Sequence, residues 1–455
     1  MELIRIDLTN FRSFRESRVE LQDFTVLVGE NECGKSNILR AIELLDRDVS
    51  WEGHVRFALD DEGVVDKGSV RFVFSFSEDD YDAIESNISA LIFCNNEYVF
   101  GALRGKDVTL SEYIRDHIKE GVFTVNIKDG KRWGSSWTLK AAEFVPADHI
   151  FSVATGCPQD FLIDGVQVAK YKFFSAESNI SSEYLKPVDV KSLYSNLYTV
   201  IGRYTSDNLP RVVYWKYAEG QLFPDEILIS EFVEDNDICV PLKNIFIAAG
   251  VQEDEISSEI ERRLGGHRND LRNYLRYVSS RATEQLRRVW LDSDVSLELT
   301  LDGVNILCGI RDKYNSFGVG QRSEGFKRVL SFLLQISAVA PNRIKGEYVV
   351  LIDEPDACLH PSAIRSLRDE LVRLSSVYKV VAATHSIFMI DRGNIDRHII
   401  VKKENEITTV QRPSNSNFFS EEVLYNALTY SMFSVLKERN FILEGGTTIA
   451  CLNLL

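Results

Sequence analysis

The chain has 455 residues, of which 44% are hydrophobic and 26% are charged. This is the composition of an ordinary globular protein, and the length is sufficient for two or three domains with cores of their own. The net charge of −16 argues against a protein that coats nucleic acid with its whole surface, although it leaves room for a local basic groove.

The seven cysteines are scattered along the chain and none forms a C-x-x-C pair. This excludes a disulfide framework or a zinc site as the organising feature and favours a reducing, cytoplasmic location. No apolar run approaches the roughly 20 residues that span a bilayer, so we expect no membrane association. The chain opens directly on a strand pattern, the alternating Ile4, Ile6 and Leu8, and not on the pattern of a signal peptide.

The stretch from Phe24 to Asn37, FTVLVGENECGKSN, fits the spacing G-x-x-x-x-G-K-[ST] of a phosphate-binding loop. Residues 25–28 predict a short buried strand, and the apolar residues between positions 38 and 45 predict a helix that is buried on one broad face. A strand, a glycine loop and a helix in this order are the context that supports the motif. The sequence therefore predicts binding of a nucleoside triphosphate.

The residue types of this loop suit that chemistry. Gly29 and Gly34 lack a Cβ, so the backbone can curl with its amides toward an anionic oxygen, and the start of the next helix adds unpaired amides. Lys35 is expected to reach the outer phosphates, and the Ser36 hydroxyl is expected to bind Mg²⁺. The candidate nucleotide-binding residues of the loop are Asn31, Gly34, Lys35, Ser36 and Asn37.

The middle of the chain carries periodic segments. Alternating apolar residues predict strands at 70–76 and 122–127, the second followed by a Lys-Asp-Gly-Lys turn, and residues 212–215 predict another buried strand. Spacings of three and four predict helices over 256–264 and 271–289, separated by Gly265-Gly266. Residues 295–310 predict a hairpin that turns at Asp302-Gly303.

Arg268, Arg272 and Arg276 fall on one face of the second of these helices. Such a stripe could bind DNA phosphates. The alternative, which we favour, is a solvated helix face paired with nearby acids, because most surface charge runs mean only solvation. The acids in reach are Glu255, Glu259 and Glu261. DNA is therefore a candidate partner only.

Two carboxylates follow an apolar strand at 348–352. In open α/β sheets ligands bind at the carboxyl ends of strands, which is where Asp353 and Glu354 stand. Asp353 is expected to hold Mg²⁺ through its water shell, and Glu354 to polarise the water that attacks the γ-phosphate.

A second buried strand, residues 380–384, leads into His385. A third stretch, residues 317–331, begins a helix at which Ser323 supplies a hydroxyl, either for phosphate or as an ordinary helix cap.

These motifs carry a family resemblance. The sequence "IRIDLTNFRSF…FTVLVGENECGKSNILRAIELL" resembles the N-terminus of RecF-like, SMC-type members of the ABC ATPase superfamily. The resemblance implies an α/β fold, an ABC-type ATPase head with a mixed sheet and an inserted helical arm, with ATP and Mg²⁺ as cofactors. It also implies a role near the nucleotide for Arg12 and makes His385 the switch histidine that senses the γ-phosphate.

Residues 317–331 resemble the ABC signature motif, with Ser323 and Gly325 on its serine and second glycine and Glu324 in place of its first glycine. In the superfamily this motif reaches the nucleotide of another subunit. The resemblance thus implies a homodimer or higher homo-oligomer that closes on ATP. The glutamine that touches Mg²⁺ in such ATPases cannot be assigned among the candidates Gln159, Gln167 and Gln221.

The segment EPDACLHP, residues 354–361, resembles the overcoming-lysogenization-defect (OLD) family and related phage-defence ATPases, including the Gabija type. That family carries a TOPRIM nuclease after the ATPase. Residues 440–448 resemble the opening of a TOPRIM domain, in which Glu444 would be a metal ligand, although Thr448 stands where the family has an acid. Glu444 is equally well explained as an ordinary strand-end residue. We expect an ATPase head over 1–435, interrupted by an insertion at about 90–290, and the start of a truncated TOPRIM domain at 436–455.

The function expected from these features is Mg²⁺-dependent ATP hydrolysis by a clamped dimer that regulates a nuclease, attached or separate, in DNA metabolism or anti-phage defence. A lone carboxylate cannot support two-metal cleavage, so nuclease activity of this chain alone is not expected. One alternative is a RecF-like DNA repair clamp. Another is a low-turnover ATP sensor or scaffold that holds a toxin or nuclease partner.

Overall fold

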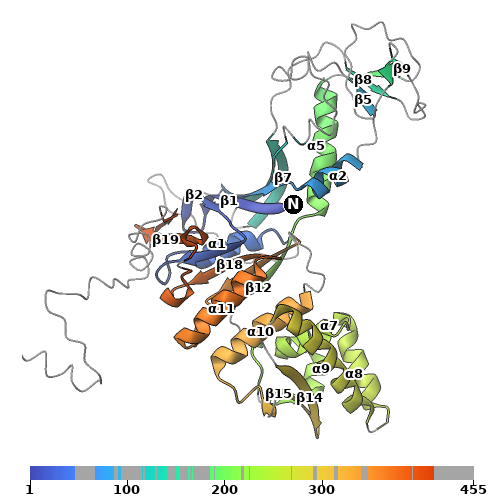
Figure 1. The fold of residues 1–455 in the computed structure, drawn as a ribbon, viewed down its shortest axis with the longest axis vertical. Helices are drawn as coiled ribbons and strands as arrows, with labels where there is room; N and C mark the ends of the chain where they lie inside the picture. The colour runs from blue at the N-terminus through green and yellow to red at the C-terminus, as the bar shows by residue number, and fades with distance from the viewer. Residues whose placement is uncertain are drawn as a thin grey trace, which may run out of the picture.

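The computed structural model is drawn in Figure 1, with two sheets in the middle, a helical lobe below them and small strands with a long helix above. The structure describes residues 1–46, 67–86, 91–93, 115, 118–128, 131–140, 150–153, 162–163, 166–167, 185–188, 190–216, 220–224, 226–267, 269–290, 295–311, 316–339, 347–391 and 393–413.

A six-stranded sheet with the order β12-β17-β18-β3-β19-β20 forms the centre of the molecule. The pairs from β12 to β19 are parallel, and only β20 at the edge is antiparallel. The strands are β12 (Arg211–Trp215), β17 (Tyr348–Asp353), β18 (Lys379–Thr384), β3 (Phe24–Val28), β19 (His398–Glu404) and β20 (Ile407–Gln411). This sheet confirms the expected α/β fold with a mixed sheet, and it includes the predicted strands at 25–28, 212–215, 348–352 and 380–384.

Successive side chains of these strands point to opposite faces of the sheet, and each face packs into a hydrophobic core of its own. On β3, Val26 packs into one core while Leu27 packs into the other, and on β17 Val350 and Leu351 divide in the same way. Because successive residues of a strand point to opposite faces, continuous apolar runs are what a sheet covered on both faces requires. These apolar runs therefore hold the central sheet between two cores.

A second, antiparallel sheet with the order β2-β1-β4-β6-β7 covers one of these cores. Its strands are β2 (Phe14–Glu20), β1 (Glu2–Phe11), β4 (Lys67–Ser75), β6 (Glu120–Lys128) and β7 (Lys131–Lys140). Helix α1 (Lys35–Glu43) shares this core through Ile38, Leu39 and Ile42. Within the expected insertion at about 90–290, β6 and β7 pair in the antiparallel sheet and β12 pairs in the central sheet.

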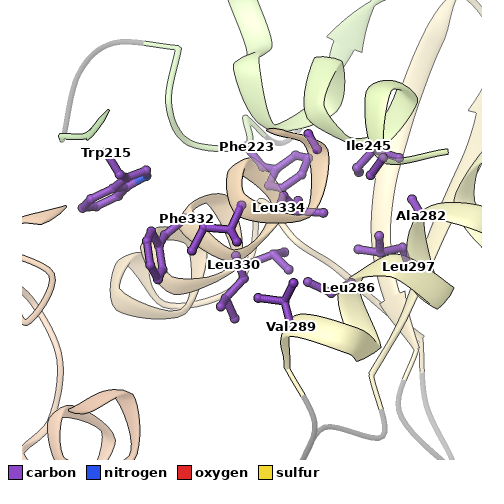
Figure 2. Packing of buried hydrophobic residues seen from close by; sticks show 14 of the residues in the cluster. Trp215, Phe223, Ile245, Ala282, Leu286, Val289, Leu297, Leu330, Phe332 and Leu334 are labelled. Atoms are coloured by element: carbon purple, nitrogen blue, oxygen red, sulfur yellow. The ribbon is translucent and has the colours of Figure 1, made fainter. Parts of the chain in front are cut away.

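The helical lobe packs on the other core, where Phe223, Leu286 and Leu330 lie close together (Figure 2). Trp215 of β12 meets Phe332 edge-on, with 6.2 Å between ring centroids, and so joins the lobe to the central sheet. The lobe contains α6 (Ile229–Glu234), α7 (Val240–Ala248), α8 (Ile256–Leu264), α9 (Asp270–Val289), α10 (Glu324–Val339), β13 (Ile227–Leu228), β14 (Ser296–Asp302), β15 (Asn305–Arg311) and β16 (Ser316–Gly318). The predicted helices at 256–264 and 271–289 and the predicted hairpin are confirmed.

The other α-helices and strands of the described residues belong to neither sheet nor to the helical lobe. They are α2 (Glu78–Ser86), β5 (Leu91–Phe93), β8 (Ile150–Val153), β9 (Leu162–Ile163), β10 (Val166–Gln167), β11 (Leu185–Val188), α5 (Val190–Asp207) and α11 (Pro361–Leu374). The Trp137 indole of β7 donates a hydrogen bond to Ser206 of α5 at 3.2 Å, which fixes α5 on the antiparallel sheet. Within the described ranges, no helix combines the length and the apolar composition needed to cross a membrane.

Candidate functional site

Three loops meet at one edge of the central sheet. The loop after β3 is followed by α1, the loop after β18 carries His385, and the loop after β17 begins at Glu354. These three strands are neighbours in the order β17-β18-β3 and run parallel. Their carboxyl ends therefore lie side by side, which is the position at which open α/β sheets bind ligands.

The glycine loop between β3 and α1 is packed too tightly for a side chain at either of its two motif glycines, Gly29 and Gly34. A Cβ on Gly29 would lie 2.3 Å from the Val401 carbonyl oxygen, and a Cβ on Gly34 would lie 2.7 Å from Thr408 Oγ1. Gly34 also has φ of 111° and stands at the N-cap of α1. Both glycines are thus required by close approach, and Gly34 also by its backbone conformation.

Lys35 points back into the loop. Its ammonium group donates hydrogen bonds to the carbonyl oxygens of Gly29, at 2.9 Å, and Glu30, at 2.6 Å. The residue is only 5% exposed. The ammonium group also contacts Cys33 Sγ at 3.9 Å. No ion pair with a carboxylate is found for Lys35 among the described residues, so the ammonium group is left to bind an anion.

Ser36 and Asp353 are joined across the site. The Ser36 hydroxyl donates to Asp353 Oδ1 at 3.1 Å, and the Tyr214 hydroxyl of β12 donates to Asp353 Oδ2 at 3.2 Å. Burial raises the pKa of the Asp353 carboxyl, although both hydrogen bonds act in the opposite direction. It also raises the pKa of Tyr214. Two hard oxygens side by side suit Mg²⁺, which is commonly bound by one or two protein oxygens together with substrate phosphates.

Glu354 and His385 form a half-exposed pair. His385 Nδ1 lies 3.7 Å from Glu354 Oε1, and the two side chains are 45% and 49% exposed, respectively. Glu354 has φ of 50°, the left-handed region that a non-glycine residue rarely adopts. Its backbone amide is held by the Ala383 carbonyl at 3.0 Å. Such strain persists only where the surrounding structure holds it, and it is typical of functional positions.

Asp356 is a residue of this edge that the sequence reasoning missed. It is 4% exposed and accepts a hydrogen bond from Thr384 Oγ1 at 2.8 Å. Thr384 Oγ1 in turn accepts from the Ser386 amide at 2.9 Å. Burial raises the pKa of Asp356. The contact joins the loop after β17 to the residues on both sides of His385, and the acid two positions after Glu354 was its only signal in the sequence.

Arg12 and Asn37 lie together beside the loop. Arg12 stands in the turn between β1 and β2 with φ of 51° and donates from Nη1 to Asn37 Oδ1 at 3.0 Å. Burial and the nearby Arg40 lower the pKa of its guanidinium. Asn31 is exposed and lines a cavity of about 470 Å³ between residues 30–33 and 401–404. The structure thus places Arg12, Asn31 and Asn37 next to Lys35, and their contact with a nucleotide stays a prediction.

Ser323 and Gly325 stand at the start of α10 in the helical lobe. Ser323 Oγ accepts from the Phe326 amide at 3.4 Å and so caps the helix. A Cβ on Gly325 would lie 2.5 Å from Leu359 Cδ2 and 2.8 Å from the Cys358 carbonyl oxygen. In the described part of the chain, no hydrogen bond links either residue to the loop at 29–36. Their action on the nucleotide of another subunit remains a prediction.

Glu324, the departure from the signature motif, has a local explanation. Its carboxylate pairs with Arg328 one turn later, at 2.6 Å, and Arg328 is 8% exposed. An acid in the first turn also complements the positive end of the helix dipole. A glycine here would leave the Arg328 guanidinium without this partner in a poorly hydrated position.

No hydrogen bond or ion pair joins the remaining candidates that the structure describes to this site. Gln221 is tied to α10 through its own carbonyl oxygen, which accepts from Ser331, and the side chain of Gln167 in β10 is not among those described. Gln159, Arg268, Glu444 and the whole of 436–455 lie outside the described residues. The magnesium-contacting glutamine and the expected start of a TOPRIM domain thus stay as predictions.

Of the arginines near α9, those of α8 are paired. Glu259 binds Arg262 at 3.0 Å and also Arg263. Arg272 and Arg276 are exposed, and within the described residues no ion pair is found for them. The expected solvated face is therefore found for Arg272 and Arg276. Besides the two arginines of α8, Arg281 of α9 is paired, with Glu284 at 3.0 Å.

Comparison with known proteins identifies two ATPase segments. Residues 1–132 match the family model of an AAA ATPase domain, and residues 309–391 match an AAA domain described as a putative AbiEii toxin of a type IV toxin–antitoxin system. The first segment holds the glycine loop and the second holds Asp353, Glu354 and His385. The matched segments are far apart in sequence but meet at one edge of the central sheet.

Relatives and solved structures are distant. The Old nuclease of Escherichia phage P2 is 25% identical over 489 aligned residues, which cover 98% of this chain and 68% of the nuclease. The Septu protein PtuA of Bacillus mycoides strain KBAB4 is 25% identical over 52% of this chain, and the match spans only 31% of PtuA. An Smc head bound to the C-winged helix domain of ScpA is similar over 90% of this chain and 97% of that structure, at 14% identity and a TM-score of 0.45. The chain therefore carries an AAA-type ATPase domain in two segments and is a distant relative of the Old nuclease.

Proposed function

We propose that this chain is a Mg²⁺-dependent ATPase of the OLD type. The observation that carries the proposal is the convergence of Lys35, the Ser36–Asp353 pair and the Glu354–His385 pair at the carboxyl ends of three adjacent strands. The ATPase segments matched by the family models contain all five residues. A chance glycine loop would not bring an acid pair and a histidine to the same edge.

Each side chain has a task that follows from its surroundings. Lys35, which is charged and shielded from water, would bind the outer phosphates. Ser36 and Asp353 would hold Mg²⁺, which neutralises phosphate charge when bound. Glu354 would take a proton from the attacking water, because its side chain is half-exposed and its salt-bridge contact among the described residues is the His385 imidazole at 3.7 Å. His385 would donate to the γ-phosphate or its product.

We further propose that ATP closes a homodimer and that closure regulates a nuclease in DNA metabolism or anti-phage defence. The exposed cap at Ser323, which is not linked to the loop of its own chain, supports action on a second subunit. The relationship to the Old nuclease supports a nuclease partner, either an attached TOPRIM domain that would begin at 436–455 or a separate chain. A low-turnover ATP sensor would show the same binding with little hydrolysis.

A DNA clamp is the second candidate function. It is favoured by Arg272 and Arg276, which are exposed without an ion pair among the described residues, in a chain that is otherwise strongly acidic. The clamp reading requires DNA affinity that depends on ATP and weakens steeply with salt.

The deciding experiment is ATP hydrolysis by the chain of 455 residues. Lys35→Ala should abolish nucleotide binding and hydrolysis, while Lys243→Ala, a lysine of the helical lobe paired with Asp237 and Glu253, should leave both unchanged. Retained ATP affinity in Lys35→Ala would remove the site assignment. The same preparation should not cut DNA, because a lone carboxylate cannot support two-metal cleavage. Metal-dependent cleavage by it would contradict this expectation.

A further inference from the structure

Thr408 of the edge strand β20 reaches the glycine loop from 375 residues away. Its hydroxyl lies 2.8 Å from the Cys33 carbonyl oxygen and 2.7 Å from Ser13 Oγ. Its backbone amide donates to the Ser13 carbonyl at 2.7 Å. Thr408 is 1% exposed. One buried side chain thus joins the β1–β2 turn to the phosphate loop.

The direction of these hydrogen bonds can be worked out from the available protons. The Cys33 carbonyl can only accept, so the single hydroxyl proton of Thr408 goes to it. The contact with Ser13 must then use the Ser13 proton, which leaves Ser13 Oγ free to accept from Asn37 Nδ2 at 2.9 Å. Asn37 Oδ1 accepts from Arg12. A single directed chain therefore runs from Arg12 through Asn37, Ser13 and Thr408 to the loop carbonyl.

The same side chain also fills the space next to Gly34. A Cβ on Gly34 would meet Thr408 Oγ1 at 2.7 Å and Thr408 Cγ2 at 3.0 Å. The position of Thr408 is fixed by its strand, because Lys403 of β19 pairs with it and Arg412 beyond the end of β20 donates to the Glu20 carbonyl at 2.9 Å. The loop backbone is thus held by a hydrogen bond and by contact.

The held carbonyl determines where an amide points. The Cys33 carbonyl and the Gly34 N–H belong to one planar trans peptide, so they point in opposite directions. With the carbonyl directed at Thr408, the Gly34 N–H is directed away from it. Backbone amides with a fixed direction are the groups by which a glycine loop binds phosphate.

We propose that Thr408 is a positioning residue for the nucleotide, which orients the Cys33–Gly34 peptide so that the Gly34 amide is ready to bind phosphate. The proposal rests on the proposed function, since it assigns a role within the same nucleotide site. Thr408 itself does not contact the nucleotide. It acts through the loop, and its hydroxyl is the group that matters.

Three variants separate the hydroxyl from the packing. Thr408→Val keeps the shape and removes the hydroxyl, whereas Thr408→Ser keeps the hydroxyl and removes the methyl group. Thr409→Val is the matched control, because Thr409 is the exposed neighbour on the opposite face of the strand. The affinity for a fluorescent ATP analogue and the steady-state constants KM and kcat are measured for each in the chain of 455 residues.

We expect Thr408→Val to weaken nucleotide binding and raise KM about tenfold, the effect of losing one well-placed hydrogen bond, with kcat nearly unchanged because Glu354 and His385 are untouched. Thr408→Ser should restore affinity to within about threefold, and Thr409→Val should match the parent protein. The increase in Tm on adding ATP should also shrink in Thr408→Val, since that increase reports affinity independently of the stability of the free protein.

The outcomes distinguish this proposal from the proposed function. If the parent protein binds no nucleotide, the proposed function fails first. If the parent protein binds ATP and Lys35→Ala does not, but Thr408→Val binds like the parent, only the role of Thr408 is refuted. Equal losses in Thr408→Ser and Thr408→Val would also refute it, because the hydroxyl would not be the cause.

Discussion

His385 Nδ1 lies 3.7 Å from Glu354 Oε1, across the carboxyl ends of the neighbouring strands β18 and β17. The strands are in register, with Asp353 opposite Ala383, and the Glu354 amide donates to the Ala383 carbonyl. The backbone therefore continues the ladder one residue past the strand and places the acid beside the histidine. A base and a γ-phosphate sensor would be held together in this way.

Glu354→Gln should stop hydrolysis while ATP binding persists. The amide cannot accept a proton from water, so we expect turnover to fall by about 10²- to 10⁴-fold. The variant should accumulate as the ATP-bound closed dimer, which light scattering with and without ATP would detect. Glu255→Gln, an exposed acid of the helical lobe, is the control and should hydrolyse ATP normally. Normal hydrolysis by Glu354→Gln would remove Glu354 as the base.

Asp353→Asn should separate stability from activity. Burial raises the pKa of Asp353 above its ordinary value, so its ionised form is disfavoured in the folded protein and stability is lost as the pH rises through the folded pKa. Asparagine can accept from one of the Ser36 and Tyr214 hydroxyls through Oδ1 and donate to the other hydroxyl oxygen through Nδ2, without the buried charge. At pH 7.5 without nucleotide we expect Tm to rise by about 1–2 °C, while Mg²⁺-dependent hydrolysis is lost. Exposed Asp302→Asn should change neither quantity, and a lower Tm in Asp353→Asn would contradict the assigned electrostatic cost.

Gly325→Ala tests the contact between α10 and the loop after β17. The added methyl group would meet the backbone of Cys358 and the side chain of Leu359, and overpacking of this kind costs about 1–3 kcal/mol. We expect the free energy of unfolding in urea to fall by that amount. Gly134→Ala is the control, because a Cβ on Gly134 meets open space and Gly134 has no positive φ. Gly303 is not suitable, because its φ is 60°. An unchanged free energy of unfolding in Gly325→Ala would show that the start of α10 and the loop after β17 can move apart without cost.

Local patterns predicted much of this fold and its site. The strand, loop and helix from Phe24 to Glu43 could be predicted because motif and periodicity lie within one short stretch, and Asp353 could be placed because it ends an apolar strand. Thr408 and Tyr214 could not be found in this way. Their partners lie 375 and 139 residues away, and a threonine in an edge strand or a tyrosine in an apolar strand has no local signal for such a contact.

Local sequence patterns also could not predict which strands pair in the same sheet. The strand at 122–127 and its turn were predicted from alternation, but its pairing with β4 depends on residues about 50 positions earlier. The expected insertion at about 90–290 includes β6, β7 and β12, whose pairing with distant strands periodicity does not show. Periodicity identifies strands, whereas the register that assigns them to a sheet is set by contacts between distant segments.

Removing the charges of Arg272 and Arg276 tests the DNA clamp. Arg272→Gln together with Arg276→Gln should weaken ATP-dependent DNA binding and reduce the slope of log affinity against log salt by about 2, if each arginine contacts one phosphate. The matched control is Arg262→Gln with Arg281→Gln, two arginines already paired with Glu259 and Glu284. Equal losses in both double variants would indicate an effect of net charge alone and would exclude a specific stripe.

His398 should make the stability of the protein fall in mildly acidic solution. The imidazole at the start of β19 is fully buried, its Nε2 accepts from the Asp391 amide at 3.0 Å, and its Nδ1 lies 3.0 Å from the Ile395 carbonyl oxygen. This pattern fits only the neutral ring with the proton on Nδ1. Burial lowers its pKa, against the influence of Asp391, which raises it.

The sign of this dependence follows from proton binding. In the unfolded chain the histidine takes up a proton below a pH of about 6.5, whereas the folded state resists protonation until its lowered pKa. The unfolded state therefore binds more protons in that interval. As the pH is lowered through it, the free energy of unfolding should fall by up to about 1.4 kcal/mol per pH unit. Urea unfolding between pH 7.5 and 5.5 measures this slope. His398→Gln should reduce it by this amount, while exposed His267→Gln should not. If the slope in His398→Gln stayed the same as in the parent protein, His398 would protonate equally well in the folded and unfolded states. That result would contradict the role assigned to its contact with the Asp391 amide.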